Sequence, residues 1–281
     1  MRPSRPSSRA SASSSALPEL PEVEAARKAA LRHLQGRRIV SARCAPDAIV
    51  LCGVSPRRIE RALRGATIEN AGRFGKHLWL ELDSKPWPVF HFGMTGRFHF
   101  FGTADETPRF LRLELVLDNG HRFAFADARR FGRLRLAHDP RNEPPINGLG
   151  HDPLFGLPEG AQLVREIGAR HAPIKAVLLD QKTFAGVGNW IADEVLYQAA
   201  IRPQRPASDL SVTEITRLRT ALLRVIRLAV AVNADSDRFP AGWLFHRRWG
   251  RVKNSKTLEG APIEHDTVGG RTTAWVPSRQ R

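Results

Sequence analysis

The chain has 281 residues and a mass of 31.3 kDa, long enough to bury two hydrophobic cores. Its 44 lysine and arginine residues and 28 aspartate and glutamate residues give a net charge of +16, which favours a polyanionic partner such as nucleic acid. No run of eighteen apolar residues is present to cross a membrane, and the two cysteines, Cys44 and Cys52, support neither a disulfide framework nor a cysteine zinc site.

Residues 1–17 form a segment that is rich in serine, proline and arginine and contains no acidic residue. Such a composition cannot build a packed core. It predicts a disordered arm or an organelle transit segment, and a misplaced start codon would produce the same pattern.

The stretch Pro18-Glu19-Leu20-Pro21-Glu22 precedes an amphipathic helix. Pro21 suits the first helical turn, Glu22 complements the positive helix end, and Gly36 follows as a stop signal. One face of the predicted helix carries Val23, Ala26, Ala30, Leu31 and Leu34.

Between Gly36 and Leu136 the pattern indicates mainly β-strands. Leucines alternate with other residues over 111–117, Asp118-Asn119-Gly120 forms a turn, and Phe123 and Phe125 resume the alternation, which predicts a hairpin. Further strands are expected at 39–43, 77–82 and 89–101, and a short helix at 55–63. We therefore expect a two-sheet β-sandwich with its N-terminal helix over residues 18–140.

A linker composition occupies residues 141–157, and a helical pattern follows over 158–240. The expected helices are 159–170, 173–180, 189–200 and 211–232, the last opened by Ser211 and Glu214 in capping-box spacing. The glycine-containing turn at 182–188 ends at a predicted helix N-terminus, where exposed N–H groups suit a phosphate.

Residues 241–281 return to short strands and carry many basic side chains, among them Arg251 and Lys253. The stretch 268–276 predicts a turn that leads into a strand. His246 and His265 have no suitably spaced further ligands, so we expect no metal site and no cofactor.

Five motifs occur in order along the chain, and together they resemble the formamidopyrimidine-DNA glycosylase and endonuclease VIII family of base-excision repair enzymes. They are Pro18 to Glu24, Phe92-Gly93-Met94-Thr95-Gly96, Arg129-Arg130-Phe131-Gly132, Leu179 to Trp190, and Gly269-Gly270-Arg271-Thr272. The resemblance is strongest to the plant and fungal branch, which has a zincless finger. It implies an α+β fold: the N-terminal helix and β-sandwich, then a helical domain with a helix-two-turns-helix unit, and a zincless β-hairpin finger over 241–281.

The resemblance implies four catalytic residues. Pro18, as a free N-terminal amine, would attack C1′ of the sugar, and Glu19 would handle protons at the sugar. Lys76 corresponds to the family lysine assigned to β-elimination, and Arg271 to the finger arginine assigned to δ-elimination and phosphate contact.

The resemblance also implies five DNA-binding residues. Met94, Arg129 and Phe131 would fill the gap left by a flipped nucleotide, while Lys175 and Asn189 would hold phosphates. Judged without the resemblance, the residue types favour ordinary roles: Met94 and Phe131 as core residues, Asn189 as a helix cap, and Lys76 as a solvated strand charge.

The expected function is that of a bifunctional DNA glycosylase and abasic-site lyase acting by β,δ-elimination on double-stranded DNA. Ring-opened or hydantoin lesions are the expected substrates, with weaker action on 8-oxoguanine. We expect a monomer, without membrane association, in a DNA-containing compartment, either the nucleus or an organelle. Two alternatives are a non-catalytic nucleic-acid-binding protein of the same fold, inactive because Pro18 is not exposed, and a ribosome-associated protein.

Overall fold

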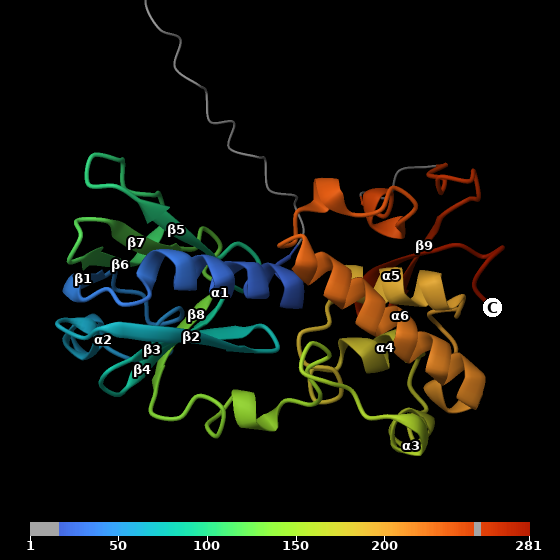
Figure 1. Ribbon diagram of the computed structural model, residues 1–281. Helices are drawn as coiled ribbons and strands as arrows, with labels where there is room; N and C mark the ends of the chain where they lie inside the picture. Colours follow the sequence, from blue (N-terminus) through green and yellow to red (C-terminus); the bar gives the residue numbers. More distant parts are fainter. Residues whose placement is uncertain (1–16, 250–253) are drawn as a thin grey trace, which may run out of the picture.

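The structure is a computed structural model that describes residues 17–249 and 254–281. The predicted arm lies outside the described residues except for Leu17, as do Arg251 and Lys253 of the basic tail. Figure 1 shows a sheet-containing half beside a helical half, with α1 beginning next to α6 and running from there along the sandwich.

Helix α1 spans Leu20–Leu34, as the sequence predicts, and joins the two halves. Leu20 is packed in the helical core, and its N–H donates to Gly186 O at 3.1 Å. Val23 and Leu34 belong instead to the core of the sandwich. The two ends of one helix are therefore anchored in different cores, which fixes the start of the chain at the boundary between them.

The sandwich consists of two four-stranded antiparallel sheets. One sheet has the order β1 (Ile39–Cys44), β6 (Leu111–Leu117), β7 (Arg122–Ala126) and β5 (Arg97–Phe101). The other has the order β2 (Ile68–Phe74), β3 (His77–Leu82), β4 (Trp87–His91) and β8 (Arg133–Ala137), and α2 spans Pro56–Leu63. The predicted hairpin is confirmed, because Leu115 pairs with Phe123 and Leu113 with Phe125.

One strand prediction in this half is wrong. The run expected as a strand over 89–101 is divided into β4 and β5, which lie in different sheets. The chain turns at Gly93, whose φ is +59° and where a Cβ would lie 2.3 Å from the Phe131 backbone. The two motifs that contain Gly93 and Phe131 approach each other so closely that only a residue without a side chain fits at Gly93.

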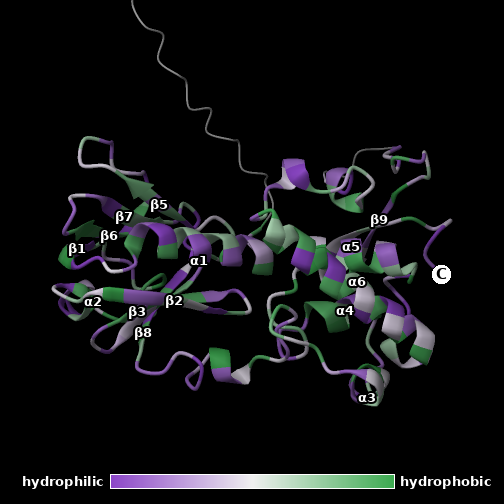
Figure 2. Cartoon of the chain, viewed as in Figure 1, coloured by the Kyte–Doolittle hydropathy of each residue, from purple (hydrophilic) through white to green (hydrophobic). Residues whose placement is uncertain are grey.

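The helical half contains α3 (Gly160–Gly168), α4 (Ile174–Leu179), α5 (Asn189–Ala199) and α6 (Val212–Ala231), close to the predicted ranges. The capping box of α6 is confirmed, since Ser211 Oγ accepts from Glu214 N at 3.3 Å and Glu214 Oε2 accepts from Ser211 N at 2.9 Å. Hydrophobic and hydrophilic residues alternate along α6 in Figure 2, and the predicted apolar stripe is buried: Ile215, Leu218, Leu222, Val225 and Ala229. Short 3-10 helices lie at Ile146–Gly148, Ala207–Asp209, Ser236–Arg238 and Leu244–His246.

The chain ends in the predicted hairpin, formed by β9 (Glu264–Val268) and β10 (Arg271–Trp275). A small apolar cluster packs the hairpin against α5, and it includes Tyr197, Ala274 and Val276. Within the described ranges, no helix is long and apolar enough to cross a membrane.

Candidate active site

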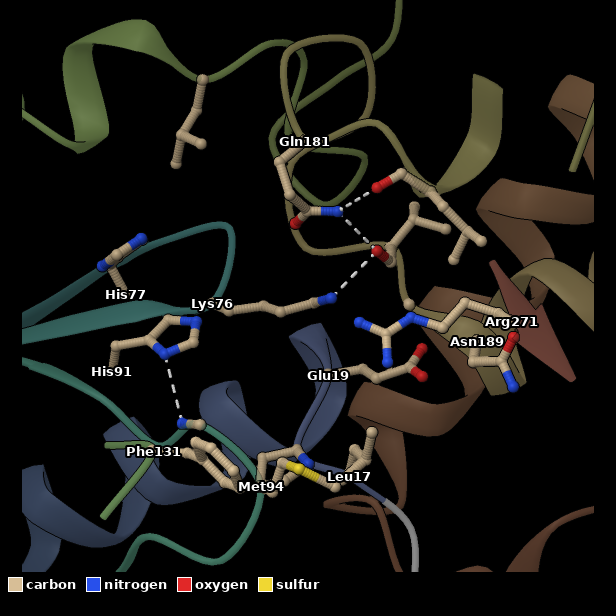
Figure 3. Close-up of a pocket in the computed structure, with 16 residues that line it drawn as sticks. Leu17, Glu19, Lys76, His77, His91, Met94, Phe131, Gln181, Asn189 and Arg271 are labelled. Atoms are coloured by element: carbon tan, nitrogen blue, oxygen red, sulfur yellow. Dashed lines mark hydrogen bonds between the residues drawn. The ribbon is translucent and has the colours of Figure 1, made fainter. Parts of the chain in front are cut away.

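A cavity of about 390 Å³ lies between the two halves, and all four predicted catalytic residues line it: Pro18, Glu19, Lys76 and Arg271. Met94, Phe131 and Asn189 line the same cavity. In Figure 3, Lys76 extends from the sandwich toward Glu19 and Arg271, which come from the start of the chain and from the final hairpin. Residues more than 250 positions apart along the chain, Pro18 and Arg271, thus meet in one place.

Glu19 is held at the N-terminus of α5 and is only 2% exposed. Its carboxylate accepts hydrogen bonds from Trp190 N at 2.9 Å and from Ile191 N at 3.2 Å. A Cβ on Gly188 would lie 2.2 Å from Glu19 Cδ, so the glycine makes room for the acid. Burial raises the pKa of Glu19, while Lys76 and the two N–H groups oppose this shift. Two of the N–H groups predicted to suit a phosphate therefore bind a carboxylate of the protein itself.

Lys76 lies in the turn between β2 and β3, and its Nζ donates to Val187 O across the cavity at 3.0 Å. The alternative interpretation as a solvated strand charge is wrong, because the side chain is half-buried and outside the strands. Burial lowers the pKa of Lys76, and nearby Glu19 opposes this shift. The amine consequently gives up its proton more readily than that of a solvated lysine.

A buried ion cluster, here called the turn cluster, supports Lys76 and consists of Glu24, Arg73 and Asp152. Arg73 pairs with Glu24 Oε2 at 2.9 Å and with Asp152 Oδ2 at 2.6 Å. Asp152 Oδ2 also accepts from Gly75 N at 2.7 Å, and Gly75 O accepts from the Arg73 guanidinium at 2.8 Å. Both polar groups of the backbone immediately before Lys76 are thus bound by buried side chains.

Met94 and Phe131 lie next to each other at the cavity, as Figure 3 shows. Phe131 is 47% exposed and Met94 is half-buried, so the interpretation of both as core residues is wrong. Arg129 does not line the cavity, and its guanidinium instead lies 5.1 Å from the centre of the Phe131 ring. Arg129 N is held by Thr95 Oγ1 at 3.1 Å, which ties the two motifs together.

Asn189 and Arg271 approach the cavity from the helical half. Asn189 is the first residue of α5, while Gly188 is the cap, so the interpretation of Asn189 as the helix cap is wrong. Its Nδ2 donates to Thr272 O at 2.9 Å, and its buried Oδ1 has no hydrogen-bond partner among the described residues. Arg271 is exposed at the start of β10 and extends into the cavity.

Lys175 does not lie where a phosphate could reach it, which corrects its prediction as a phosphate ligand. The side chain is fully buried, and its Nζ lies 2.6 Å from Asp193 Oδ1. It also donates to Thr273 Oγ1 at 2.7 Å and to Thr272 O at 3.1 Å. Each of its donors therefore faces a group of the protein, behind Arg271.

Three polar side chains that line the cavity were not predicted as site residues, namely Gln181, His77 and His91. Gln181 holds the glycine-containing turn, because its Nε2 donates to Val187 O at 2.8 Å and its Oε1 accepts from Gly186 N at 3.0 Å. His77 and His91 pair across β3 and β4, and burial lowers their pKa values to about 3 and about 4. Both imidazoles are neutral at pH 7. Gln181 stands inside a quoted motif, whereas the histidines show no spacing that would have revealed them.

Two family models match the chain over most of its length. They are the formamidopyrimidine-DNA glycosylase N-terminal domain over residues 17–134 and the formamidopyrimidine-DNA glycosylase H2TH domain over 149–240. The chain is 41% identical over 273 residues to formamidopyrimidine-DNA glycosylase of Arabidopsis thaliana, covering 92% of this chain and 70% of that protein. It is 32% identical over 270 residues to the enzyme of that name from Geobacter sulfurreducens, covering 92% and 98%.

Solved structures show the same fold. The Lactococcus lactis formamidopyrimidine-DNA glycosylase bound non-covalently to DNA with an abasic site matches with a TM-score of 0.83 and 24% identity, covering 94% of this chain and 99% of that one. A structure of MutM in complex with DNA containing carbocyclic 8-oxo-G matches with a TM-score of 0.83 and 25% identity, covering 94% and 100%. The identities and coverage of the sequence relatives show that this chain belongs to the formamidopyrimidine-DNA glycosylase family.

Proposed function

We propose that this protein is a bifunctional DNA glycosylase of base-excision repair that uses Pro18, Glu19, Lys76 and Arg271. It removes ring-opened or otherwise oxidised bases from double-stranded DNA and cleaves the resulting abasic site by β,δ-elimination. The carrying observation is that the four side chains line one cavity of nucleotide-like size, from three separate parts of the chain. Membership of the family and the abasic-site DNA bound by a structural neighbour support this function.

The first step is a nucleophilic substitution at the sugar. A free proline amine has a pKa about two units below that of lysine, so more of it is unprotonated near neutral pH. The nitrogen of Pro18 forms a bond to C1′, and the bond from C1′ to the base breaks. Glu19, whose pKa is raised by burial, supplies a proton to the ring oxygen, which opens the sugar and leaves an imine.

The eliminations then remove both flanking phosphates. In β-elimination a proton leaves C2′ and the 3′-phosphate departs, and in δ-elimination a proton leaves C4′ and the 5′-phosphate departs. Lys76 is suited to proton transfer because burial lowers the pKa of its amine and favours the neutral base. Arg271 carries a fixed positive charge at the cavity, which stabilises a departing phosphate.

Lesion recognition requires the nucleotide to be flipped out of the duplex, because a stacked base cannot reach the cavity. Met94 and the exposed Phe131 supply an apolar surface for the vacated space, with Arg129 stacked on Phe131 as a donor for the orphaned base. Asn189 stands at the start of α5, and its Nδ2 has a second N–H beside the one that donates to Thr272 O, so we assign it to a nearby backbone phosphate at this helix terminus.

The proposed chemistry requires Pro18 to become the N-terminal residue, since an amide nitrogen is not nucleophilic. Leu17 lines the cavity together with Pro18. A DNA-repair enzyme acts inside the cell, and a transit segment over 1–17 would couple import into an organelle to activation. Nuclear action with a later start of translation is the other form of this proposal.

We further assign residues 18–140 to a catalytic domain, 141–157 to a linker, 158–240 to the helical domain and 241–281 to the finger.

Base excision and strand cleavage by two matched proteins test this function. One protein begins at Pro18 and the other retains residues 1–17, and both are incubated with a duplex carrying a single formamidopyrimidine or 8-oxoguanine. We expect the first to release the ring-opened base and to leave phosphates at both ends of the gap, with slower action on 8-oxoguanine. Tight binding of the lesion duplex without base release by either protein would favour the non-catalytic alternative.

A further inference from the structure

Asp193 and the cations around it form a second buried ion cluster, here called the finger cluster, with Lys175 and Arg248. Asp193 and Lys175 are fully buried, and Arg248 is nearly so. Asp193 Oδ2 lies 2.6 Å from the Arg248 guanidinium, and Asp193 Oδ1 lies 2.6 Å from Lys175 Nζ. Ala274 N of β10 also donates to Asp193 Oδ2, at 3.1 Å. The cluster thus joins α4, α5 and the segment after Phe245 to the final hairpin.

Thr273 connects this cluster to Arg271. The residue is fully buried, and its Oγ1 accepts from Lys175 Nζ at 2.7 Å while it donates to Arg271 O at 3.1 Å. Lys175 Nζ also donates to Thr272 O at 3.1 Å, and the same oxygen accepts from Asn189 Nδ2 at 2.9 Å. One ammonium group therefore fixes the backbone on which Arg271 stands and the carbonyl that orients Asn189.

The hairpin is held by contacts with the helical half, among them the apolar cluster around Tyr197 and the hydrogen bonds to Asp193, Lys175 and Asn189. Both cysteines of the chain lie in the first 52 residues, so no cysteine metal site can hold residues 241–281. At the hairpin tip a Cβ on Gly269 would lie 3.1 Å from Ala176 Cβ, so the tip lies directly against α4, next to Lys175. A displacement of about 1 Å at a catalytic group can cost on the order of a hundredfold in rate, so the backbone of Arg271 must be well fixed.

We propose that Thr273 and Lys175 are positioning residues for Arg271 in δ-elimination, and that Asp193 holds Lys175 in place. This inference rests on the proposed function, because it uses the role assigned there to Arg271. Contacts that run from Asp193 through Lys175 and Thr273 to the Arg271 carbonyl, here called the relay, hold the backbone of the hairpin in place of a stabilising metal. The relay acts on the second elimination and leaves the attack by Pro18 intact.

The decisive variant is Thr273→Val, which has nearly the same shape and removes both hydrogen bonds without leaving Lys175 unpaired. With protein beginning at Pro18 and a duplex carrying one abasic site, we measure the rate of imine trapping by borohydride and the ratio of δ- to β-elimination products in a single turnover. We expect trapping to stay within about twofold and the product ratio to fall about tenfold, in keeping with a positional effect on one step. Thr273→Ser, which restores the hydroxyl, should return the ratio toward that of the wild type.

Two further variants separate positioning from a general loss of stability. In the background of Arg271→Ala, Thr273→Val should cause no further fall in the product ratio, because the two changes act on the same group. Arg122→Met removes a half-buried ion pair with Glu114 in the sandwich and serves as the destabilised control, with an unchanged ratio. Lys175→Met should reproduce the effect of Thr273→Val.

Three results would overturn the inference. The first is an unchanged product ratio in Thr273→Val, and the second is a ratio that falls further when Thr273→Val is added to Arg271→Ala. The third is a parallel fall of trapping and of both eliminations. Each would show that the relay does not act through Arg271. If the wild-type protein neither traps nor cleaves the abasic site, the proposed function itself fails and the inference fails with it. Trapping by the wild type with an unaltered ratio in the variants would refute the inference alone.

Discussion

Each half of the molecule has a buried ion cluster that binds the backbone beside a catalytic residue, and the two clusters differ in the number of cations that pair with the carboxylate nearest that backbone. In the turn cluster Asp152 pairs with Arg73, and the same carboxylate oxygen accepts from Gly75 N before Lys76. Glu24 pairs with Arg73 and also with Arg27, at 2.6 Å. The finger cluster contains two cations and one carboxylate. Its spare ammonium donors bind the Thr272 carbonyl and the Thr273 hydroxyl beside Arg271.

Both clusters bind backbone N–H and C=O groups, since Arg73 donates to Gly75 O and Asp193 accepts from Ala274 N. The clusters differ in that, among the described residues, Asp152 pairs with one cation, Arg73, whereas Asp193 pairs with two, Lys175 and Arg248. The two clusters should therefore respond differently when one charged group is removed.

The largest effect is expected for Arg73→Met in the turn cluster. In the part of the chain that the structure describes, Arg73 is the only cation paired with Asp152, so this change leaves a buried carboxylate that is held by backbone N–H groups alone. We expect a loss of about 3–5 kcal/mol in the free energy of unfolding, measured in urea, together with loss of strand cleavage. A loss below about 1 kcal/mol would show that Asp152 is not dependent on this pairing.

A smaller effect is expected for Lys175→Met in the finger cluster. Asp193 keeps Arg248 as a partner, so the remaining pair is neutral and no carboxylate is stranded. The free energy of unfolding should fall by about 2–3 kcal/mol through lost hydrogen bonds and altered packing. A destabilisation equal to that of Arg73→Met under the same conditions would contradict the proposed difference between the clusters.

Glu194 adds a pH dependence to the helical half. Burial raises its pKa to about 7, and its carboxyl accepts from Phe245 N at 2.9 Å. Because the folded state holds the proton more tightly, this group's contribution is greatest below pH 4.5 and is lost as pH rises from there to about 7. Relative to the wild type, Glu194→Gln should gain on the order of 2 kcal/mol in the free energy of unfolding between pH 5 and pH 8. A constant difference between the two proteins across this range would refute the raised pKa.

The smallest effect on stability is expected for Phe131→Ala in the sandwich, since this side chain is 47% exposed. The free energy of unfolding should change by no more than about 0.5 kcal/mol. Affinity for a duplex with an abasic site should nevertheless fall about tenfold, because the wedge that fills the gap is lost. Fluorescence anisotropy with labelled duplex measures this change, and equal binding by both proteins would remove Phe131 from the DNA interface.

Regular elements with a strong pattern could be predicted from the sequence. Alternation between 111 and 117 revealed the hairpin, and the capping residues located the start of α6, because both signals are local. Strand β2 carries the buried Arg73 and has a register shift between Ile68 and Asn70, so no regular alternation of apolar residues marks its bounds. The break at Gly93 depends on the approach of Phe131, a contact between residues 38 positions apart.

The ordered motifs identify several residues of the cavity, but they do not predict how deeply these side chains are buried or which groups they contact. Lys175 has the character of a surface charge, and only the placement of Asp193 and Thr273 explains its burial. The same is true of His77 and His91, which become neighbours through the pairing of β3 with β4. Long-range packing decides these cases, and no local pattern reports it.

The most direct test of the account is the identity of the nitrogen that forms the imine. Protein beginning at Pro18 is reduced with borohydride on a duplex containing one abasic site, and the adduct is digested and mapped by mass spectrometry. We predict a single adduct on the N-terminal peptide at Pro18, absent from protein that retains residues 1–17. An adduct on the peptide containing Lys76, or none despite tight binding of the duplex, would contradict the proposed catalytic role of Pro18.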